Sequence, residues 1–289
     1  MPPYLLINPL SGSYSPALRS QLLSLLESAG ITPQVLTVTG PEDARRVCAQ
    51  IEAVHENPFV IVAGGDGTIN AVVNSLTPGH STLAVLPVGT ANVLARELGI
   101  GSLSDAVQRI ARGSSRPFSV GVIEGRDGGR QRFVLMAGIG LDGSVVQGVR
   151  PWEKRRFKKG AYLLSALRCF LKWRSSRFSL QVDGRVLKCH SVIICNASRY
   201  GGNFVLMPEA RIFEPQLELF CITSATRSSY LNIILDVLTG RDCRDKDVTR
   251  ISTTQFEIDG DSLMQLDGDY SDLAPARISI FADFARIIV

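Results

Sequence analysis

The sequence predicts an N-terminal α/β domain with a mostly parallel sheet, followed by a second domain that is mainly an antiparallel β-sandwich. The first observation is size, because 289 residues of which 45% are hydrophobic can bury two cores. The second is the alternation of apolar strand-like runs with helical patterns up to about residue 117, which is typical of a parallel sheet covered by helices. The third is the change beyond that residue to shorter segments separated by Asp-Gly pairs, which favours antiparallel hairpins.

The N-terminal elements follow one another as strand and helix. A first strand at residues 4–7 is broken by Asn8-Pro9, and the helix after it has Ser15 as its N-cap, Pro16 at its first position and Gly30 at its end. Further strands are predicted at residues 34–38, 59–63 and 83–86, and further helices at residues 43–52, 71–76 and 92–98.

The C-terminal part contains short strands joined by tight turns. Strands are predicted at residues 133–136, 178–182, 191–195, 217–222 and 254–258, with turns at residues 127–128, 183–184, 259–260 and 267–268. Apolar residues at helical spacing predict helices at 160–174 and 230–238. We therefore divide the chain into residues 1–117, residues 118–280, and a final strand at 281–289 that returns to the first domain.

Composition narrows the class of protein. Six cysteines without Cys-x-x-Cys spacing and three histidines suggest neither a zinc ribbon nor a disulfide framework. The N-terminus lacks the pattern of a signal peptide, and no run of about 18 apolar residues occurs, so we expect a cytoplasmic protein without a membrane span. Residues 150–177 hold ten basic residues and one acidic residue within a chain of net charge +4.

A glycine-rich segment follows the strand at residues 59–63. The sequence Gly64-Gly65-Asp66-Gly67-Thr68 lies where parallel sheets place their ligands, and such a turn directs backbone N–H groups at phosphate oxygens. A tight turn alone would explain the glycines, but it would need neither the carboxylate nor the hydroxyl. The Lys-Ser/Thr ending of a Walker A motif is missing, so an ordinary P-loop NTPase is not indicated.

Two stretches about 20 residues apart carry a resemblance to a known family. Residues 64–76, GGDGTINAVVNSL, and residues 86–100, LPVGTANVLARELGI, resemble the diacylglycerol kinase catalytic family, which includes bacterial lipid kinases and sphingosine kinases. Further matching positions span nearly the whole chain: Asn8-Pro9 with Ser11-Gly12, the segments from Ala137 and from Cys195, Pro208-Glu209-Ala210, and Asp267-Gly268-Asp269. The resemblance implies ATP and Mg²⁺ bound in a cleft between the two domains, and a lipid substrate held by the sandwich.

The resemblance also implies roles for individual residues. Nucleotide-binding positions are Gly64, Gly65, Asp66, Gly67, Thr68, Ile69, Asn70, Thr90, Thr39 and Asn8. Asp269 would accept the proton of the lipid hydroxyl, and Asp66 would organise the metal or that hydroxyl. Asp142 and Val93 would border the lipid, although Asp142 fits a turn cap equally well. Glu214, with the backbone carbonyls of Arg211 and Gln216, would hold a structural magnesium.

Three positions depart from the family pattern. Val93 stands where relatives often have aspartate; Glu97, one helical turn further on, would either compensate or be a surface charge. The segment 213–218 replaces an Asp-Asp-Gly-x-Leu-Asp stretch, so Glu214 is either a metal ligand or a solvated side chain. Asp269 stands where the family usually has glutamate, which keeps the carboxylate but shortens its reach by one methylene.

Two other patterns have competing interpretations. Residues 138–143 match a dinucleotide fingerprint by letter, but no second parallel strand or suitably spaced acid follows, so the match is accidental. The basic segment 150–177 is interleaved with aromatic residues and would dock on anionic lipid, or else form a solvated helix face. We expect peripheral membrane contact and no nucleic acid, and the sequence does not indicate an oligomeric state.

The predicted function is therefore ATP-dependent phosphorylation of a diacylglycerol-like or sphingoid-like lipid. Two alternatives remain: an NAD-kinase-like enzyme, which shares the GGDGT loop, and a family member that binds lipid or nucleotide with weak catalysis. The segment Gly89-Thr90-Ala91-Asn92 argues against the first alternative.

Overall fold

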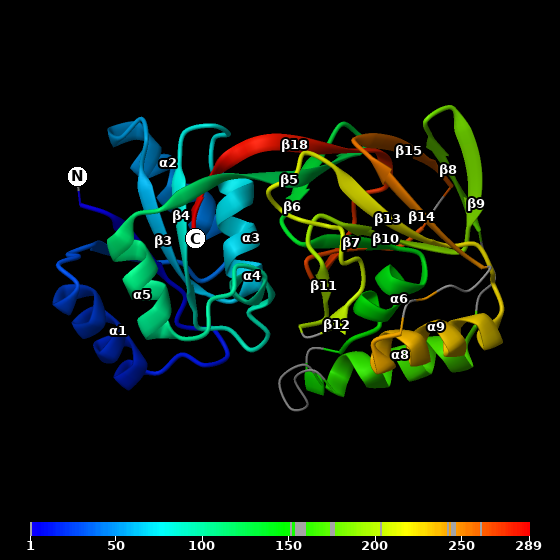
Figure 1. The fold of residues 1–289 in the computed structure, drawn as a ribbon, viewed down its shortest axis with the longest axis horizontal. Helices are drawn as coiled ribbons and strands as arrows, with labels where there is room; N and C mark the ends of the chain where they lie inside the picture. Colours follow the sequence, from blue (N-terminus) through cyan, green and yellow to red (C-terminus); the bar gives the residue numbers. More distant parts are fainter. Residues whose placement is uncertain are drawn as a thin grey trace.

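The computed structural model describes residues 2–150, 152–153, 160–173, 177–202, 204–241, 243, 247–260 and 262–289. Figure 1 shows two parts side by side, joined along one edge by long strands. The N-terminal part combines helices with a parallel sheet, and the C-terminal part is mostly antiparallel sheet. This arrangement confirms the predicted fold class.

The N-terminal sheet has its strands in the order β2 (Gln34–Thr37), β1 (Tyr4–Ile7), β3 (Phe59–Gly64) and β4 (Thr82–Pro87), all parallel to one another. Both β1 and β3 are almost entirely buried, as expected of central strands with both faces covered. The helices are α1 (Pro16–Ser28), α2 (Pro41–Val54), α3 (Asp66–Ser75), α4 (Val93–Glu97) and α5 (Leu103–Arg112). Helix α2 packs with α3, and α1 packs with α5.

Two helix starts bear on the site. In α1, Ser15 caps the helix by accepting a hydrogen bond from Leu18 N, and Pro16 is the first helical residue, as predicted. Helix α3 begins at Asp66, five residues before the predicted start at 71. The glycines at 65 and 67 therefore belong to the cap and first turn of a helix rather than to a loop before one.

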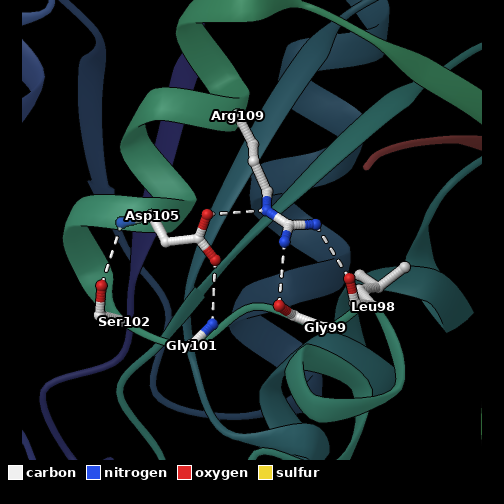
Figure 2. Close-up of polar contacts among 6 residues, drawn as sticks. All are labelled: Leu98, Gly99, Gly101, Ser102, Asp105 and Arg109. Carbon is white, nitrogen blue, oxygen red and sulfur yellow. Dashed lines mark hydrogen bonds and ion pairs between the residues drawn. The ribbon is translucent and has the colours of Figure 1, made fainter.

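Helix α5 was not predicted, and it fixes the end of α4. Its N-cap, Ser102, accepts from Asp105 N at 3.1 Å, and Arg109 reaches back to donate to Leu98 O and Gly99 O at 3.0 and 2.9 Å. Figure 2 shows Arg109 also bonded to Asp105, whose other oxygen accepts from Gly101 N. Arg109 lowers the pKa of Asp105, and its charge lies at the C-terminal end of α4, where a cation is favoured.

The C-terminal part is a sandwich. One sheet has the strand order β14 (Val248–Thr253), β13 (Leu217–Ile222), β10 (Ser191–Cys195), β7 (Met136–Ile139), β16 (Met264–Leu266) and β17 (Asp269–Ser271), all antiparallel. Facing it are β5 (Ser115–Gly125), β6 (Arg130–Phe133), β15 (Gln255–Asp259), β8 (Phe178–Val182) and β9 (Arg185–Cys189). The core between the layers takes side chains from both, including Phe133, Leu180, Val192, Leu219 and Phe256. A small hairpin pairs β11 (Arg199–Tyr200) with β12 (Phe204–Val205).

The strand β18 (Pro275–Ile288) runs through both parts. It pairs with β15 and along most of β5, and near its end Arg286 and Ile287 pair in parallel with Thr82 and Leu83 of β4. The parallel sheet and the outer sandwich layer are therefore one continuous ten-stranded sheet. The domain boundaries that we proposed after residues 117 and 280 fall inside β5 and β18.

Among the described residues, the sandwich is accompanied by the helices α6 (Leu141–Gln147), α8 (Gly160–Leu171) and α9 (Arg227–Thr239), the last two at the positions predicted from apolar spacing. Residues 138–143 lead from β7 into α6, but β7 pairs with β10 and β16 in antiparallel fashion. A dinucleotide-binding βαβ unit is thus excluded at this segment. Among the helices described, none is both long enough and apolar enough to cross a bilayer.

Candidate active site

A cavity of about 750 Å³ lies between the two parts of the molecule, and both contribute to its walls. Ten of the residues selected from the sequence line it: Asn8, Thr39, Gly65, Asp66, Gly67, Thr68, Thr90, Val93, Asp142 and Asp269. Residues distant in sequence therefore meet where the resemblance predicts a cleft.

The first turn of α3 forms one wall of the cavity. It follows β3 directly, so Gly65, Asp66 and Gly67 lie at the carboxyl end of a central parallel strand. The first N–H groups of a helix have no partner within it, and the positive end of the helix dipole lies there. Asn8, at the end of β1, donates to Thr68 Oγ1 at 2.8 Å and ties this turn to the neighbouring strand. The turn thus presents backbone N–H donors at the wall of the cavity, as helix starts that bind anions do.

A second loop, after β4, packs directly against the first. A Cβ at Gly89 would lie 2.4 Å from Cα of Gly65, so no larger residue fits where the two backbones touch. Asn92, in the left-handed conformation, accepts from Gly89 N at 2.8 Å and donates to Gly89 O at 3.0 Å. Asp66 Oδ1 accepts from Leu94 N at 3.1 Å, which joins the two helix starts.

Asp269 faces the first turn of α3 from the C-terminal part. A Cβ at Gly67 would lie only 3.1 Å from Asp269 Oδ2, so this carboxylate lies against the glycine-rich turn. Asp269 begins β17, directly after a tight turn in which Asp267 has a positive φ of 50° and Gly268 one of 93°. The hairpin of β16 and β17 thus places the Asp269 carboxylate against the first turn of α3.

Asp267 locks this hairpin to both parts of the molecule. Its two carboxylate oxygens accept from the backbone N–H groups of Val134, Leu135 and Met136 and from Asn70 Nδ2 of α3, at 2.6 to 2.9 Å. Burial raises the pKa of Asp267 to about 6, against the opposing effect of these four donors. Asn70 therefore contributes to the site by holding Asp267, whose turn positions Asp269.

The far end of the cavity holds a buried carboxylate, Asp142, at the start of α6. It accepts hydrogen bonds from Tyr200 Oη and, at 2.8 Å, from Gln265 Nε2, and burial raises its pKa. Gln265 also accepts from Gly268 N at 2.7 Å, while Tyr162 Oη of α8 donates to Gly268 O at 3.2 Å. A chain of contacts therefore runs from the Asp269 hairpin to Asp142.

Some predicted residues lie near the cavity without lining it. Gly64 packs against the side chain of Thr68, Ile69 is in the N-terminal core, and Asn70 points to Asp267. The side chains of Ile69 and Asn70 therefore contact other parts of the protein, and the nucleotide-binding role that the resemblance implies for these two positions stays a prediction. Thr39 lines the cavity and donates from N and Oγ1 to Asp43. These bonds, together with that from Arg46, lower the pKa of Asp43 to about 2.

The position that often carries aspartate in relatives is occupied by buried Val93. Glu97 neither replaces that carboxylate nor projects freely into solvent, because its oxygens accept from Ser198 N at 3.2 Å and Ser198 Oγ at 2.9 Å. Glu97 thus connects α4 to the C-terminal part.

The predicted structural metal site lies away from the cavity. Arg211 O already accepts from Glu214 N at 3.0 Å, Glu214 is exposed, and Gln216 Nε2 donates to Glu218 Oε1. Within the described residues, no three His, Cys, Asp or Glu side chains are grouped so that they could hold a metal. One carboxylate with carbonyls and water still matches the preference of Mg²⁺, so this site stays a prediction.

The sequence analysis did not single out four contributors to the site: Asn92, Tyr162, Tyr200 and Gln265. Asn92 had a usable signal, because Gly-x-x-Asn after a buried strand is a turn in which asparagine can adopt the left-handed conformation. The other three reach the cavity only through tertiary packing. Of the basic segment, residues 151, 154–159 and 174–176 lie outside the described residues.

The arrangement is that of a phosphotransferase of the kinase type: an anion-binding helix start, carboxylates facing it, and a cavity that continues beyond them. Residues 2–123 match the family model of the diacylglycerol kinase catalytic domain, and residues 136–289 match that of the YegS C-terminal NAD kinase beta sandwich-like domain.

Individual proteins agree with these matches. A protein named diacylglycerol kinase from Bacillus subtilis is 28% identical over 266 residues, which cover 89% of this chain and 86% of that protein. A Klebsiella pneumoniae protein named "Probable lipid kinase YegS-like" is 31% identical over 235 residues, covering 77% of this chain and 74% of the relative. The crystal structure of a Bacillus anthracis protein assigned as a diacylglycerol kinase superposes with a TM-score of 0.80 at 22% identity, covering 99% and 97%, and supports the fold.

The chain therefore belongs to the diacylglycerol kinase catalytic-domain family and carries the β-sandwich domain of YegS-like members. By family it is a lipid kinase, that is, a phosphotransferase, and the family implies ATP as the phosphate donor. The resemblance stated from the sequence is confirmed.

Proposed function

We propose that this chain transfers the γ-phosphoryl group of ATP to the hydroxyl group of a diacylglycerol-like or sphingoid-like lipid. The observation that carries the proposal is the approach of Asp269 to the first turn of α3, in a cavity that continues to Asp142. A phosphate at the helix start and a hydroxyl beyond it would then lie on either side of the transferred group.

The donor end of the cavity would hold the nucleotide. Backbone N–H groups of Gly65, Asp66 and Gly67 would bind the phosphates. Thr39, Asn8 and Thr90 line the cavity from the N-terminal part, whereas Asp142 lines it from the C-terminal part, so these three would border the nucleotide. Asp66 supplies a carboxylate at this turn, and one of its oxygens is held by Leu94 N, so a hard cation such as Mg²⁺ fits here. Mg²⁺ would neutralise charge on the phosphates.

The acceptor end would hold the lipid hydroxyl next to Asp269. The hydroxyl oxygen forms a bond to the γ-phosphorus as the bond from that phosphorus to the β,γ-bridging oxygen breaks, and ADP leaves. Asp269 takes the hydroxyl proton. An aspartate is a weak base, so orientation of the hydroxyl is its larger contribution. Asp142 and Val93 would contact the lipid headgroup, and Glu214 with the carbonyls of Arg211 and Gln216 would bind a separate structural Mg²⁺.

The acceptor is tested by phosphotransfer from radiolabelled ATP to a panel of diacylglycerol, monoacylglycerol, sphingosine and NAD. We expect transfer to one of the lipids, and a loss of about 10²- to 10⁴-fold in kcat for Asp269→Asn. Asp272→Asn is the matched control, because Asp272 is exposed, lies three residues further on and does not line the cavity. Transfer to NAD alone would establish the NAD-kinase-like alternative, and binding without any transfer would establish a binding protein.

We also propose contact with a membrane surface, supported by the ten basic residues in the segment 150–177. Its local net charge of +9 exceeds the net charge of +4 of the whole chain, and the proposed substrate resides in a bilayer.

A further inference from the structure

Two helices of the C-terminal part carry aliphatic side chains that no described residue covers. On α8 these are Leu163, Leu164, Leu167 and Leu171, exposed by 40% to 75%. On α9 they are Leu231, Ile234, Leu235 and Leu238, exposed by 46% to 57%. We refer to these eight residues as the α8–α9 face.

The helical spacing makes this exposure unusual. In α9 the four residues recur at i, i+3, i+4 and i+7, the pattern that normally faces a core. The core contact of α9 is made instead by the adjacent stripe of Tyr230 and Ile233, and that of α8 by Ala161 and Ser165. Each helix thus has a second apolar stripe that points outward, and a continuous apolar surface of this kind marks a binding surface.

The two helices are fixed to one another. Arg227, the first residue of α9, donates from Nη2 to Leu171 O at 3.1 Å. Trp173, just beyond α8, donates to Ala225 O at 2.8 Å and packs against the ring of Tyr230 at 5.0 Å. In Figure 1 the two helices lie together along one edge of the C-terminal part. The end of α8 and the start of α9 are therefore held together, so that the two exposed stripes lie on neighbouring helices.

The same helix that carries half of this face also borders the candidate active site. Tyr162 lines the cavity and bonds to Gly268, while its neighbour Leu163 is the most exposed residue of the face. Phe204, which lines the cavity too, is 38% exposed. A partner on the α8–α9 face would therefore lie next to the acceptor end of the cavity.

Charge identifies the partner. By sequence the segment 150–177, which contains α8, has ten basic residues and one acidic one, and Arg150, Arg168, Lys172 and Arg177 are the four basic residues of this segment that the structure describes. Helix α9 carries Arg227 and Asp236 and is followed by Arg241. A second copy of the chain would bring like charges together, whereas an anionic bilayer offers both apolar contact and opposite charge.

We propose that the α8–α9 face inserts its leucine and isoleucine side chains into the surface of an anionic lipid bilayer and so brings the acceptor end of the cavity to the membrane. The proposal extends the basic-segment contact above to a defined apolar surface that includes α9. The role of this docking in substrate access rests on the proposed function, whereas membrane binding itself does not and can be measured separately.

The test is sedimentation of the full chain with phosphatidylcholine vesicles with and without phosphatidylglycerol, in the absence of ATP. The variants are Leu163→Glu with Leu167→Glu, and independently Leu231→Glu with Leu235→Glu. Val186→Glu on β9, equally apolar and 67% exposed, is the matched control. Circular dichroism and melting verify folding, and two variants on separate helices guard against a local defect in one.

We expect wild type and the Val186 variant to bind anionic vesicles, and each double variant to lose affinity at least about tenfold, or about 1.4 kcal/mol. Phosphotransfer to a short-chain, water-soluble acceptor should be unchanged. Equal vesicle binding by the double variants, or no binding by wild type, would overturn the proposal. So would a dimer in sedimentation velocity that the substitutions dissolve without affecting vesicle binding. If binding is lost as expected but no lipid is phosphorylated, docking stands and the proposed function fails.

Discussion

Replacing Asp267 with asparagine tests how the proposed base is held. Oδ2 of Asp267 accepts from Asn70 Nδ2 at 2.6 Å and Val134 N at 2.8 Å, and Oδ1 accepts from Leu135 N at 2.8 Å and Met136 N at 2.9 Å. Asparagine keeps the shape, but one of its two polar atoms is an NH₂ group. In either orientation, two donors lose their acceptor and face another donor.

The magnitude follows from these contacts. A buried donor left without an acceptor costs about 1–3 kcal/mol, so two cost roughly 2–6 kcal/mol in the free energy of unfolding. For a chain of this size the melting midpoint should fall by roughly 3–10 °C. Because the hairpin also carries Asp269, kcat should fall more than ATP affinity does.

The assay is thermal unfolding followed by circular dichroism at neutral pH, together with steady-state kinetics and ATP titration. Asp272→Asn, near the same hairpin but exposed, should leave the midpoint within about 2 °C. A midpoint for Asp267→Asn as high as that of wild type would refute the reasoning, since it would mean that the four hydrogen bonds are not essential to the fold.

The pH dependence follows from the same residue. Burial raises the pKa of Asp267 from an ordinary 3.8 to about 6, so between these values the folded state holds a proton that the unfolded state has released. This group's contribution to stability is therefore present at low pH and is lost as pH rises through about 6, by up to about 3 kcal/mol. The Asn variant lacks that loss, so the stability gap between it and wild type should narrow from pH 4 to pH 7. A gap that widens over this range would contradict the assigned direction.

Three further substitutions are expected to separate structure from chemistry. Gly89→Ala places a Cβ about 2.4 Å from the backbone of Gly65, so we expect the free energy of unfolding to fall by about 1–3 kcal/mol. Titration calorimetry should also show loss of ATP binding. Gly101→Ala, where the added Cβ would lie in open space, should change neither quantity. Asp142→Asn should raise KM for the lipid at least about tenfold and leave KM for ATP unchanged, because it lies at the far end of the cavity; equal changes in both would count against this. Arg109→Ala removes three hydrogen bonds around the α4–α5 loop, so the free energy of unfolding measured in urea should fall by about 1–3 kcal/mol. An unchanged free energy of unfolding would contradict this prediction.

Much of the fold could be predicted because local patterns and tertiary structure agree. Apolar runs such as residues 59–63 became central strands, and Ser15 with Pro16 started α1 as expected. Helix α5 was missed although Ser102 and Asp105 form a recognisable helix start. The early start of α3 was missed because glycine disfavours helices, whereas Gly65 is only the N-cap and Gly67 is the one glycine within α3.

Site residues could be predicted where they lie together in one short sequence segment. They were harder to predict where tertiary packing brings them together from separate elements. The glycine-rich turn and Asp269 are visible in the sequence. Tyr162, Tyr200 and Gln265 come from three separate elements, and their convergence on the cavity depends on the strand order of the sandwich. The roles given to Ile69 and Asn70 followed from their place in a motif, whereas helix periodicity turns their side chains away from the cavity.

The aspartate at 269 can be understood from the way the two parts are joined. The continuous strand β18, the Asn70–Asp267 bond and the Glu97–Ser198 bonds hold the sandwich against α3 from several directions. The resulting fit is close, because a Cβ at residue 67 would lie 3.1 Å from Asp269 Oδ2 and would require this carboxylate to shift by a few tenths of an ångström. A glutamate on this hairpin would need about one more methylene of space at that contact, so the shorter acid matches the short distance. The departure from the family pattern is therefore compatible with the proposed role as base, because reach is set by the backbone rather than by side-chain length alone.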